Sequence, residues 1–229
     1  MATYNGEAHV EAQIASILDD LNPCDELVIY DDRSTDGTVD LLRLVSDPRV
    51  RVQVGAVNVG HVRAFEQTLQ SARGELIALA DQDDLWPLGR TAALATLLED
   101  VDLAVGNYRT FGADERAAIH PLVNEMFASG SPRNLAKLGL GRLSYFGSAM
   151  MLRRTLLERV LPIPPWVEAH DQWIGVVANV RGAVRHTDEV VTLRRLHGAN
   201  LTPAARRSWS AVLKTRGIQA RMMLTAVAR

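Results

Sequence analysis

Short apolar runs alternate with segments of helical spacing along the first half of the chain, and this alternation limits the possible folds most. Residues 26–32 and 75–80 are apolar runs that lead into carboxylates, and residues 50–54 alternate valine with polar side chains. Apolar residues recur at helical spacing between these runs, in residues 8–21, 38–45 and 62–72. The pattern predicts an α/β fold with a mainly parallel sheet flanked by helices.

The second half continues with less regular signals. Pro87 is expected to open a helix that runs to about Glu99, and residues 112–141 are mixed and rich in glycine, which predicts loops. The remaining expected elements are strands at 102–108, 144–152, 184–187 and 190–196, and helices at 155–161 and 171–180. We expect one domain over residues 1–203, followed by a basic helical tail over residues 204–229.

Composition places the chain among ordinary globular proteins. Its 229 residues are 47% hydrophobic with a formal net charge of -2, which gives no overall argument for a nucleic-acid partner. Cys24 is the single cysteine, so no disulfide can form within the chain. No apolar run reaches about 18 residues and no signal peptide is evident, so a cytoplasmic location is expected.

Charge is distributed unevenly. No Asp or Glu follows Glu189, whereas arginine and lysine continue to the end of the chain. A basic end predicts an anionic partner, such as a phosphate ester or the inner face of a membrane, which would give peripheral membrane contact. A solvated helical face explains the same pattern equally well.

Two groups of acids follow apolar strands, and ligands of parallel sheets bind beyond the carboxyl ends of their strands. Asp81, Asp83 and Asp84 come directly after one run, where carboxylates could share Mg²⁺ or Mn²⁺ and bridge it to phosphates. The alternative is a helix start that favours acids, which accounts for one or two of the three. Asp31 and Asp32 could accept a hydrogen bond from a base or a ribose, or could cap the next helix.

These motifs occur in an order that resembles family 2 inverting glycosyltransferases with the GT-A fold, which is Rossmann-like. The Asp-Gln-Asp-Asp-x-Trp form is similar to the rhamnosyltransferase-like branch of bacteria. The resemblance covers about residues 1–203. It rests on Thr3-Tyr4-Asn5-Gly6-Glu7, Tyr30-Asp31-Asp32-Arg33-Ser34-Thr35-Asp36-Gly37-Thr38, Asn58-Val59-Gly60 and Asp81-Gln82-Asp83-Asp84-Leu85-Trp86, and more loosely on Gly147-Ser148-Ala149-Met150, His170-Asp171-Gln172-Trp173 and Arg195-Leu196-His197-Gly198-Ala199-Asn200.

The resemblance implies a nucleotide-sugar donor, carrying UDP or dTDP, held through a divalent cation, Mg²⁺ or Mn²⁺. Asp32 or Asp31 would accept from the N3–H of uracil or thymine, and Asp83 would be the main metal ligand. Asp81 would contact the sugar nucleotide or serve as a second ligand. The other donor-side positions are Thr3, Tyr4 and Asn5 in the nucleotide pocket, Asn58, Gly60 and Arg63 near the ribose and diphosphate, and Arg195 and His197 at the diphosphate or metal.

Inversion requires a base that takes the proton of the attacking acceptor hydroxyl. The resemblance implies Asp171 for this role, although an N-cap of the helix at 171–180 explains the same residue without the family. Trp173 could form a wall of the acceptor site or simply pack in the helix. Gly147 and Ser148 match a segment near the acceptor, which the branch implies is a bacterial glycan or a lipid-linked glycan of the cell envelope.

The chain departs from this family at its start. Relatives begin with an apolar strand that leads into Thr-Tyr-Asn-Gly and lies inside the sheet, whereas this chain begins at Met1, where that strand should end. We therefore expect a truncated first strand, with folding and donor affinity both affected.

Two other functions compete with glycosyl transfer of the hexosyl or rhamnosyl type. An Asp-dependent phosphatase would place its motif on the first strand, with Thr or Val two residues after the second Asp, where this chain has Leu85. A catalytically impaired nucleotide-sugar-binding protein is the other alternative. The retention of Asp81, Asp83 and Asp171 favours an enzyme.

Overall fold

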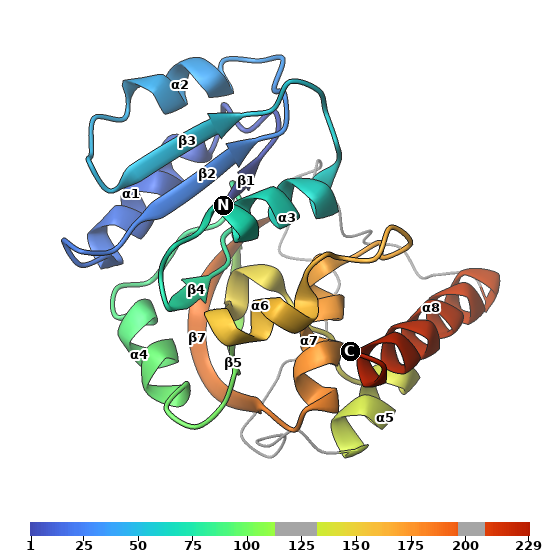
Figure 1. Ribbon diagram of the computed structural model, residues 1–229. Coiled ribbons are helices and arrows are strands. Elements are labelled where there is room, and N and C mark those ends of the chain that lie inside the picture. Colours follow the sequence, from blue (N-terminus) through green and yellow to red (C-terminus); the bar gives the residue numbers. More distant parts are fainter. Residues whose placement is uncertain (113–131, 197–208) are drawn as a thin grey trace.

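The computed structural model describes residues 1–112, 132–196 and 209–229 (Figure 1). The first part of the chain forms a three-stranded parallel sheet in the order β1-β2-β3. Its strands are β1 (Ala2–Thr3), β2 (Leu27–Asp31) and β3 (Val50–Val54), and its helices are α1 (Val10–Asp20), α2 (Thr38–Leu44) and α3 (His61–Ser71). All five residues of β2 are buried, as its continuous apolar run predicts for a covered strand.

A second, mixed sheet has the order β4-β6-β5-β7. Strands β4 and β5 are antiparallel to β6, and β5 is parallel to β7. The strands are β4 (Leu76–Ala78), β5 (Leu103–Gly112), β6 (Met150–Arg153) and β7 (Val184–Leu196). The helices around it are α4 (Arg90–Leu97), α5 (Pro132–Leu140), α6 (Arg154–Val160), α7 (His170–Val180) and α8 (Trp209–Val227), and the turn η2 (Gly147–Ala149) precedes β6. The expected α/β class is therefore confirmed.

Strand β1 has only two residues and lies at the edge of its sheet. The resemblance implies an interior position for the first strand of relatives, and a truncated strand was expected here. Ala2 and Thr3 pair with Tyr30 and Asp31 of β2. A strand of this length offers few backbone groups, so in the described residues it pairs with β2 alone. It nevertheless brings Thr3 and the following loop to the carboxyl end of β2.

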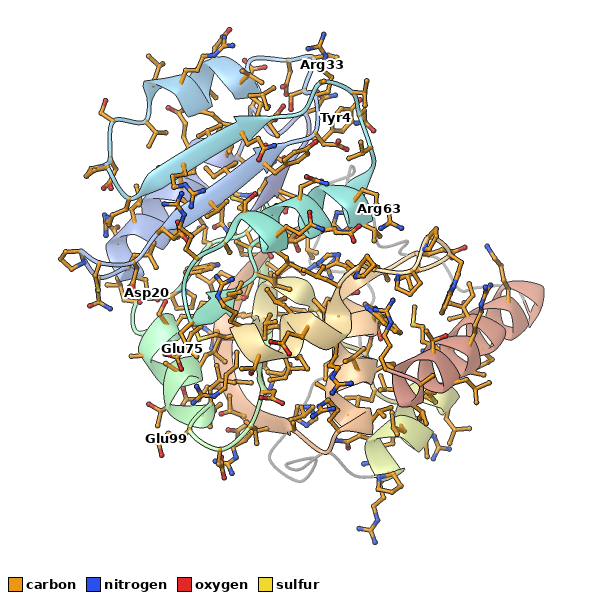
Figure 2. The ribbon with its side chains drawn as sticks, in the orientation of Figure 1. Tyr4, Asp20, Arg33, Arg63, Glu75 and Glu99 are labelled. Carbon is orange, nitrogen blue, oxygen red and sulfur yellow. The ribbon has the colours of Figure 1, made fainter. Side chains whose placement is uncertain are left out.

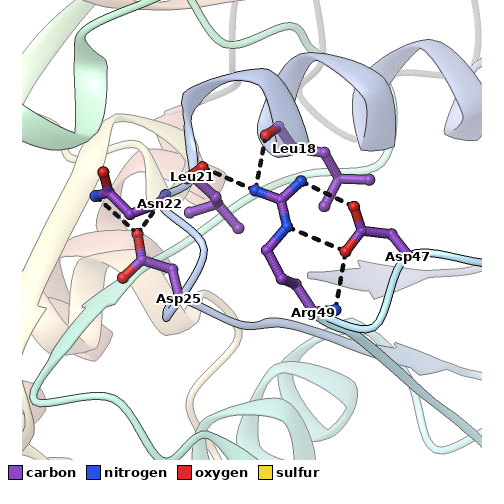
Figure 3. Close-up of polar contacts among 6 residues, drawn as sticks. All are labelled: Leu18, Leu21, Asn22, Asp25, Asp47 and Arg49. Carbon is purple, nitrogen blue, oxygen red and sulfur yellow. Dashed lines mark hydrogen bonds and ion pairs between the residues drawn. The ribbon is translucent and has the colours of Figure 1, made fainter.

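Helix α1 is joined to the start of β3 by Arg49, as Figure 3 shows. The Arg49 guanidinium donates to the carbonyls of Leu18 and Leu21 at 3.1 and 2.8 Å, and also to the Asp47 carboxylate. The last carbonyls of a helix have no partner within it, so a side-chain donor there stabilises the helix end. Arg49 thus fixes the C-terminal end of α1, whereas the loop after β1 leads into its N-terminal end.

Two expectations for the second half were wrong. Residues 132–140 form α5, because Pro132 begins it and Gly141, with φ +67°, follows its end; these two residues are helix boundaries, not loop signals. The two strands expected at 184–187 and 190–196 are one strand, β7, whose pairing with β5 shifts register around Asn107.

Helix α8 packs into the body of the protein, with Met222 and Ala226 in the main core cluster. Its cations also make internal contacts. Arg229 donates to the carbonyls of Arg159, Val160 and Pro162, Arg221 lies over the Trp166 ring, and Lys214 pairs with Glu168. Within the described residues, no helix has both the length and the apolarity to cross a membrane.

Candidate active site

The loop after β1 is bound to the loop after β2 by side-chain caps. Asn5, with φ +50°, donates its amide N–H to the Ser34 hydroxyl at 2.9 Å and accepts at Oδ1 from the Thr35 amide at 2.8 Å. The Thr38 hydroxyl accepts from the Gly6 amide, and the Glu7 carboxylate accepts from the Gly37 amide. Both Thr-Tyr-Asn-Gly-Glu and Ser-Thr-Asp-Gly-Thr therefore serve to build one rigid surface.

Asp31 and Asp32 are anchors of this surface. Asp31 is fully buried and accepts from the Thr3 hydroxyl at 2.8 Å and from the amide and hydroxyl of Ser34 at 2.8 and 2.6 Å. The Asp32 carboxylate accepts from the amides of Val59 and Gly60 at 2.7 and 2.8 Å. Each Asp32 oxygen accepts one of these bonds and retains a lone pair, although Asp32 is only 2% exposed, whereas Asp31 accepts three bonds and has no exposed surface. Asp32 is the better placed of the two expected base contacts.

Three further donor-side residues lie around this loop. Asn58 donates its side-chain amide to the Asp32 carbonyl, and Gly60, with φ +84°, precedes α3. The Arg63 guanidinium is held by other protein groups: it pairs with Glu66 and donates to the Ile163 carbonyl. Figure 2 shows Tyr4 and Arg33 at the end of the sheet to which the β2 and β3 arrows point, with Arg63 on α3 beside it.

Gln82 joins the loop after β1 to the acidic loop of residues 81–84. Its side-chain amide accepts from the Tyr4 N–H at 2.8 Å and donates to the Tyr4 carbonyl at 3.0 Å. Its side chain also lies against Gly6, where an added Cβ would come within 2.5 Å of Gln82 Oε1. The side chain of Tyr4 remains 47% exposed, so its ring is available to a ligand.

Asp81 differs from Asp31 and Asp32 in its surroundings. Burial raises the pKa of Asp81 well above its ordinary value, and the Asp84, Asp83 and Asp171 carboxylates raise it further, against the positive charge of Arg194. The Asp81 carboxylate accepts no hydrogen bond within the described part of the chain; its backbone carbonyl accepts from Gln13 at 2.8 Å. The acids of this loop therefore repel one another, and within the described residues no hydrogen bond to the Asp81 carboxylate offsets that repulsion.

Asp84 is an internal anchor and not a helix cap. It is buried, and it accepts from the Arg195 amide at 3.1 Å. Burial and the Asp83 charge raise the pKa of Asp84 to about 6. Leu85 and Leu193 exchange two backbone hydrogen bonds of 2.9 Å, which fasten the loop to β7.

Arg195 lies beside this loop, as expected. Its Nε donates to the Asp83 carbonyl at 3.1 Å, and its guanidinium lies over the Phe111 ring with Cζ 4.6 Å from the centroid. The structure thus brings Arg195 to the acidic loop through the long strand β7. His197, expected at the metal or a phosphate, lies outside the described residues.

Asp171 stands in the first turn of α7, and its charge reaches Asp81 across the site. It accepts from the Gln172 amide at 2.7 Å. Burial raises the pKa of Asp171 to about 6, which suits a base that works near neutral pH. The N-cap position of α7 belongs to Ala169, so Asp171 does not cap the helix.

Trp173 does not form a wall of this site. It is fully buried, and its indole N–H donates to the Val160 carbonyl at 2.9 Å. Helical spacing turns position 173 toward the core while position 171 faces the acids. The packing role is therefore the observed one.

His61 lies near the Asp83 and Asp32 charges, although the sequence analysis did not indicate it. Its ring contacts His170 at 4.8 Å and Phe65 at 5.1 Å between centroids, and His170 stacks on Phe65 at 3.9 Å. Burial lowers the pKa of His61, while the charges of Asp83 and Asp32 act in the opposite direction. Its place directly after Asn-x-Gly at the start of α3 is the only sequence signal that could have indicated it.

The carboxylates of the acidic loop suit a hard cation whose coordination is completed by a bound ligand. Within the described residues, no three His, Cys, Asp or Glu side chains are grouped so that they could hold a metal by themselves. Mg²⁺ and Mn²⁺ favour oxygen ligands and are commonly held by one or two carboxylates together with substrate phosphates. Asp81 and Asp83 supply carboxylates of this kind, and the repulsion at Asp81 is the observation that a divalent cation would relieve.

Comparisons with known proteins agree with this geometry. The chain is 27% identical over 215 residues to an uncharacterized glycosyltransferase of Nostoc sp., covering 87% of this chain and 64% of that protein. It is 25% identical over 225 residues to the Escherichia coli protein WfaP, named as a UDP-Glc:α-D-GlcNAc-diphosphoundecaprenol β-1,3-glucosyltransferase, covering 96% of this chain and 86% of that protein. The chain thus spans less than two thirds of the length of the first relative.

Solved structures show the same fold. Staphylococcus aureus TarS residues 1–349, in complex with UDP-GlcNAc, superimposes with a TM-score of 0.75 at 18% identity, covering 97% of this chain and 65% of that one. The mannosyltransferase PcManGT of Pyrobaculum calidifontis, in complex with GDP-Man and Mn²⁺, gives 0.65 at 20% identity, covering 99% and 71%. These likenesses support a GT-A, Rossmann-like fold.

The family model described as glycosyl transferase family 2 matches residues 1–161, which include the loop after β1, both acid groups and the Gly147-Ser148 segment. The chain belongs to glycosyltransferase family 2.

Proposed function

We propose that this chain is an inverting glycosyltransferase that moves a sugar from a UDP- or dTDP-sugar to a hydroxyl of a glycan or lipid-linked acceptor, with Asp171 as general base. One observation carries the proposal. Asp171 on α7 and the acids after β4 lie close enough for the Asp171 charge to raise the pKa of Asp81. A base and a donor-binding acid group thus meet in one site, as single displacement at an anomeric carbon requires.

The proposed donor contacts follow from the rigid surface around Asp32. Tyr4 presents an exposed ring to the base, and Asp32 accepts from its N3–H through the remaining lone pairs. Thr3 and Asn5 hold the two loops in place. Asn58 and Gly60 fix the position of Asp32 by donating to its carbonyl and its carboxylate. Arg63 supports the segment at Ile163 and is the least direct of the proposed contacts.

Asp83 and Asp81 are the proposed ligands of a divalent cation, with His197 and Arg195 near the diphosphate. Bound there, Mg²⁺ or Mn²⁺ would supply positive charge to the departing nucleoside diphosphate. The complex of PcManGT with GDP-Man and Mn²⁺ supports a role for a divalent cation in donor binding. Arg194 adds protein charge near Asp81 and Asp84.

The acceptor and the branch are also proposals. The activity for which WfaP is named supports an acceptor linked to a lipid diphosphate. The Asp-Gln-Asp-Asp-x-Trp motif supports hexosyl or rhamnosyl transfer of the rhamnosyltransferase-like type. Work on such an acceptor would place the enzyme at the inner face of the membrane. Arg229, Arg221 and Lys214 make contacts within the protein, and the side chains of Arg221 and Lys214 remain exposed.

A donor screen tests the proposal. The chain is incubated with Mn²⁺ and, separately, with UDP-glucose, UDP-N-acetylglucosamine, GDP-mannose and dTDP-rhamnose, and released nucleoside diphosphate and phosphate are measured. We expect release of nucleoside diphosphate from a UDP- or dTDP-sugar, abolished by EDTA. Release of inorganic phosphate would instead support the phosphatase, and binding without turnover would support an impaired binder.

A further inference from the structure

The buried guanidinium of Arg90 contacts the chain at both ends of the acidic loop. Its Nη2 donates to the Leu79 carbonyl at 3.3 Å, and the guanidinium lies over the Trp86 ring with Cζ 3.7 Å from the centroid. Leu79 is two residues before Asp81, and Trp86 is two residues after Asp84. One side chain therefore fixes the entry and the exit of the loop that carries the proposed metal ligands.

The same nitrogen of Arg90 also binds the segment around the start of β6. Nη2 donates to the Ser148 carbonyl of η2 at 2.8 Å and, at a longer 3.5 Å, to the Met150 carbonyl. The neighbouring Gly147 lies against the start of α7, because a Cβ placed on it would be 3.7 Å from the Asp171 Cβ. Arg90 thus joins the acidic loop to η2 and, through η2, to the helix that carries the proposed base.

The backbone on both sides of Arg90 is fixed by the end of α1. The Asp20 carboxylate accepts from the Gly89 amide at 2.5 Å and from the amide and hydroxyl of Thr91 at 2.7 and 2.6 Å. These bonds satisfy amides in the first turn of α4, which have no acceptor within the helix. The position of the Arg90 side chain is therefore set by a frame outside the acidic loop.

Packing alone does not account for a guanidinium at this position. Arg90 is 2% exposed and, within the described residues, it forms no ion pair, while its Nε and Nη1 have no hydrogen-bond partner. Burial of a cation in this way costs free energy that an apolar side chain of similar volume would not. The carbonyls that Arg90 binds, all of them next to the site, are the contacts that only a donor can make.

We propose that Arg90 is a positioning residue that holds the acidic loop against η2 and thereby sets the place of Asp81 and Asp83 for the metal-bound donor. The inference rests on the proposed function of this site. The contacts of Arg90 lie at the ends of the acidic loop, in η2 and in β6, and not on the nucleotide surface around Asp32. Loss of the guanidinium should therefore weaken the metal-dependent part of nucleotide binding and leave the metal-independent part unchanged.

Arg90→Met tests the inference by calorimetric titration of UDP in Mn²⁺ and in EDTA. Methionine keeps an unbranched stem that fills the core. The Ser148 and Met150 carbonyls each retain another donor in this variant, the Thr192 hydroxyl and the Leu79 amide. We expect the UDP dissociation constant in Mn²⁺ to rise about tenfold, with the constant in EDTA equal to that of the wild type.

Two further variants separate positioning from stability. Leu138→Ala removes buried apolar contacts of α5, which packs mainly on α7 and α8, so it should destabilise the fold and leave both UDP constants unchanged. Arg90→Lys keeps one cation that can donate to the Ser148 carbonyl but cannot stack as a planar group, so its loss in Mn²⁺ should be smaller than that of Arg90→Met.

Wild-type affinity of Arg90→Met in Mn²⁺, or an equal loss of that affinity in Leu138→Ala, would overturn the inference. If Arg90→Met does not fold, Arg90→Lys decides the matter, because its affinity in Mn²⁺ must then fall below that of the wild type while its affinity in EDTA is retained. Failure of the proposed function is separate, since it would appear as an absence of Mn²⁺-dependent UDP binding in the wild-type chain.

Discussion

Two pairs of acids stand at the ends of strands in this protein, and they are treated in opposite ways. Asp31 and Asp32 after β2 accept hydrogen bonds from hydroxyl and amide donors of the surrounding loops. Asp81 after β4 is surrounded by other carboxylates, and burial and these charges raise its pKa. Satisfied acids stabilise a fold, whereas acids left to repel one another store unfavourable energy that a cation or substrate can relieve. Asp31 therefore has an architectural role, Asp32 adds a proposed ligand contact to that role, and the chemistry is assigned to the acids after β4.

The largest expected effect comes from Asp171. Asp171→Asn keeps the shape of the side chain but removes the proton acceptor, so kcat for transfer or donor hydrolysis should fall about 10³-fold. Affinity for UDP with Mn²⁺ should remain at the wild-type level. The matched control is Asp188→Asn, an exposed acid of β7 that should leave kcat unchanged. Unaltered turnover in Asp171→Asn would remove Asp171 from the role of base.

Next in size is the effect of the proposed metal ligand. Asp83→Asn should weaken UDP binding in Mn²⁺ by about 100-fold, and should abolish most of the difference between titrations with and without Mn²⁺. Isothermal titration measures both. The matched control is Asp40→Asn, an exposed acid of α2 that pairs only with the exposed Arg43 in the described residues and should leave UDP binding unchanged. Equal metal dependence in Asp83→Asn and the wild type would show that the cation is held elsewhere.

Stability gives the sharpest contrast between the two pairs. Asp31→Ala leaves buried donors of Thr3 and Ser34 without an acceptor and should lower the free energy of unfolding by about 3 kcal/mol. Asp81→Asn removes a repelling charge and should raise it by about 1 kcal/mol while activity is lost. Urea unfolding of both variants decides the matter. A destabilised Asp81→Asn together with a neutral Asp31→Ala would reverse the assignment.

The smallest effect concerns pH. Burial raises the pKa of Asp171 to about 6, so the fraction of ionised base and hence kcat should rise from pH 5 to pH 7 by about tenfold. Stability should change in the opposite sense. An acid with a raised folded pKa stabilises the fold most below its unfolded value near pH 4, and this contribution is lost as pH rises through about 6. A kcat that is flat between pH 5 and 7 would contradict this prediction.

The sequence was most informative where local patterns determine structure. The apolar runs located β2 and β4, and the motifs located the acids at their ends, because strand burial and loop caps depend on nearby residues. It did not distinguish the donors around Asp31 from the repulsion around Asp81, since partners such as Thr3 and Asp171 are distant in the chain.

Other features depended on tertiary contacts that no local pattern records. Trp173 and Asp171 are two residues apart, yet one enters the core and the other the site. His61 gains its place only from packing against His170 of α7. Helix α5 was missed because its boundary residues, Pro132 and Gly141, are also typical of loops.

Calorimetric titration of the wild-type chain with UDP, with and without Mn²⁺, tests the central claim most directly. If the acids after β4 hold a donor diphosphate through a divalent cation, UDP should bind with one site per chain in Mn²⁺, and its affinity should fall at least about tenfold in EDTA. Binding of equal strength under both conditions, or no binding in Mn²⁺, would contradict the account.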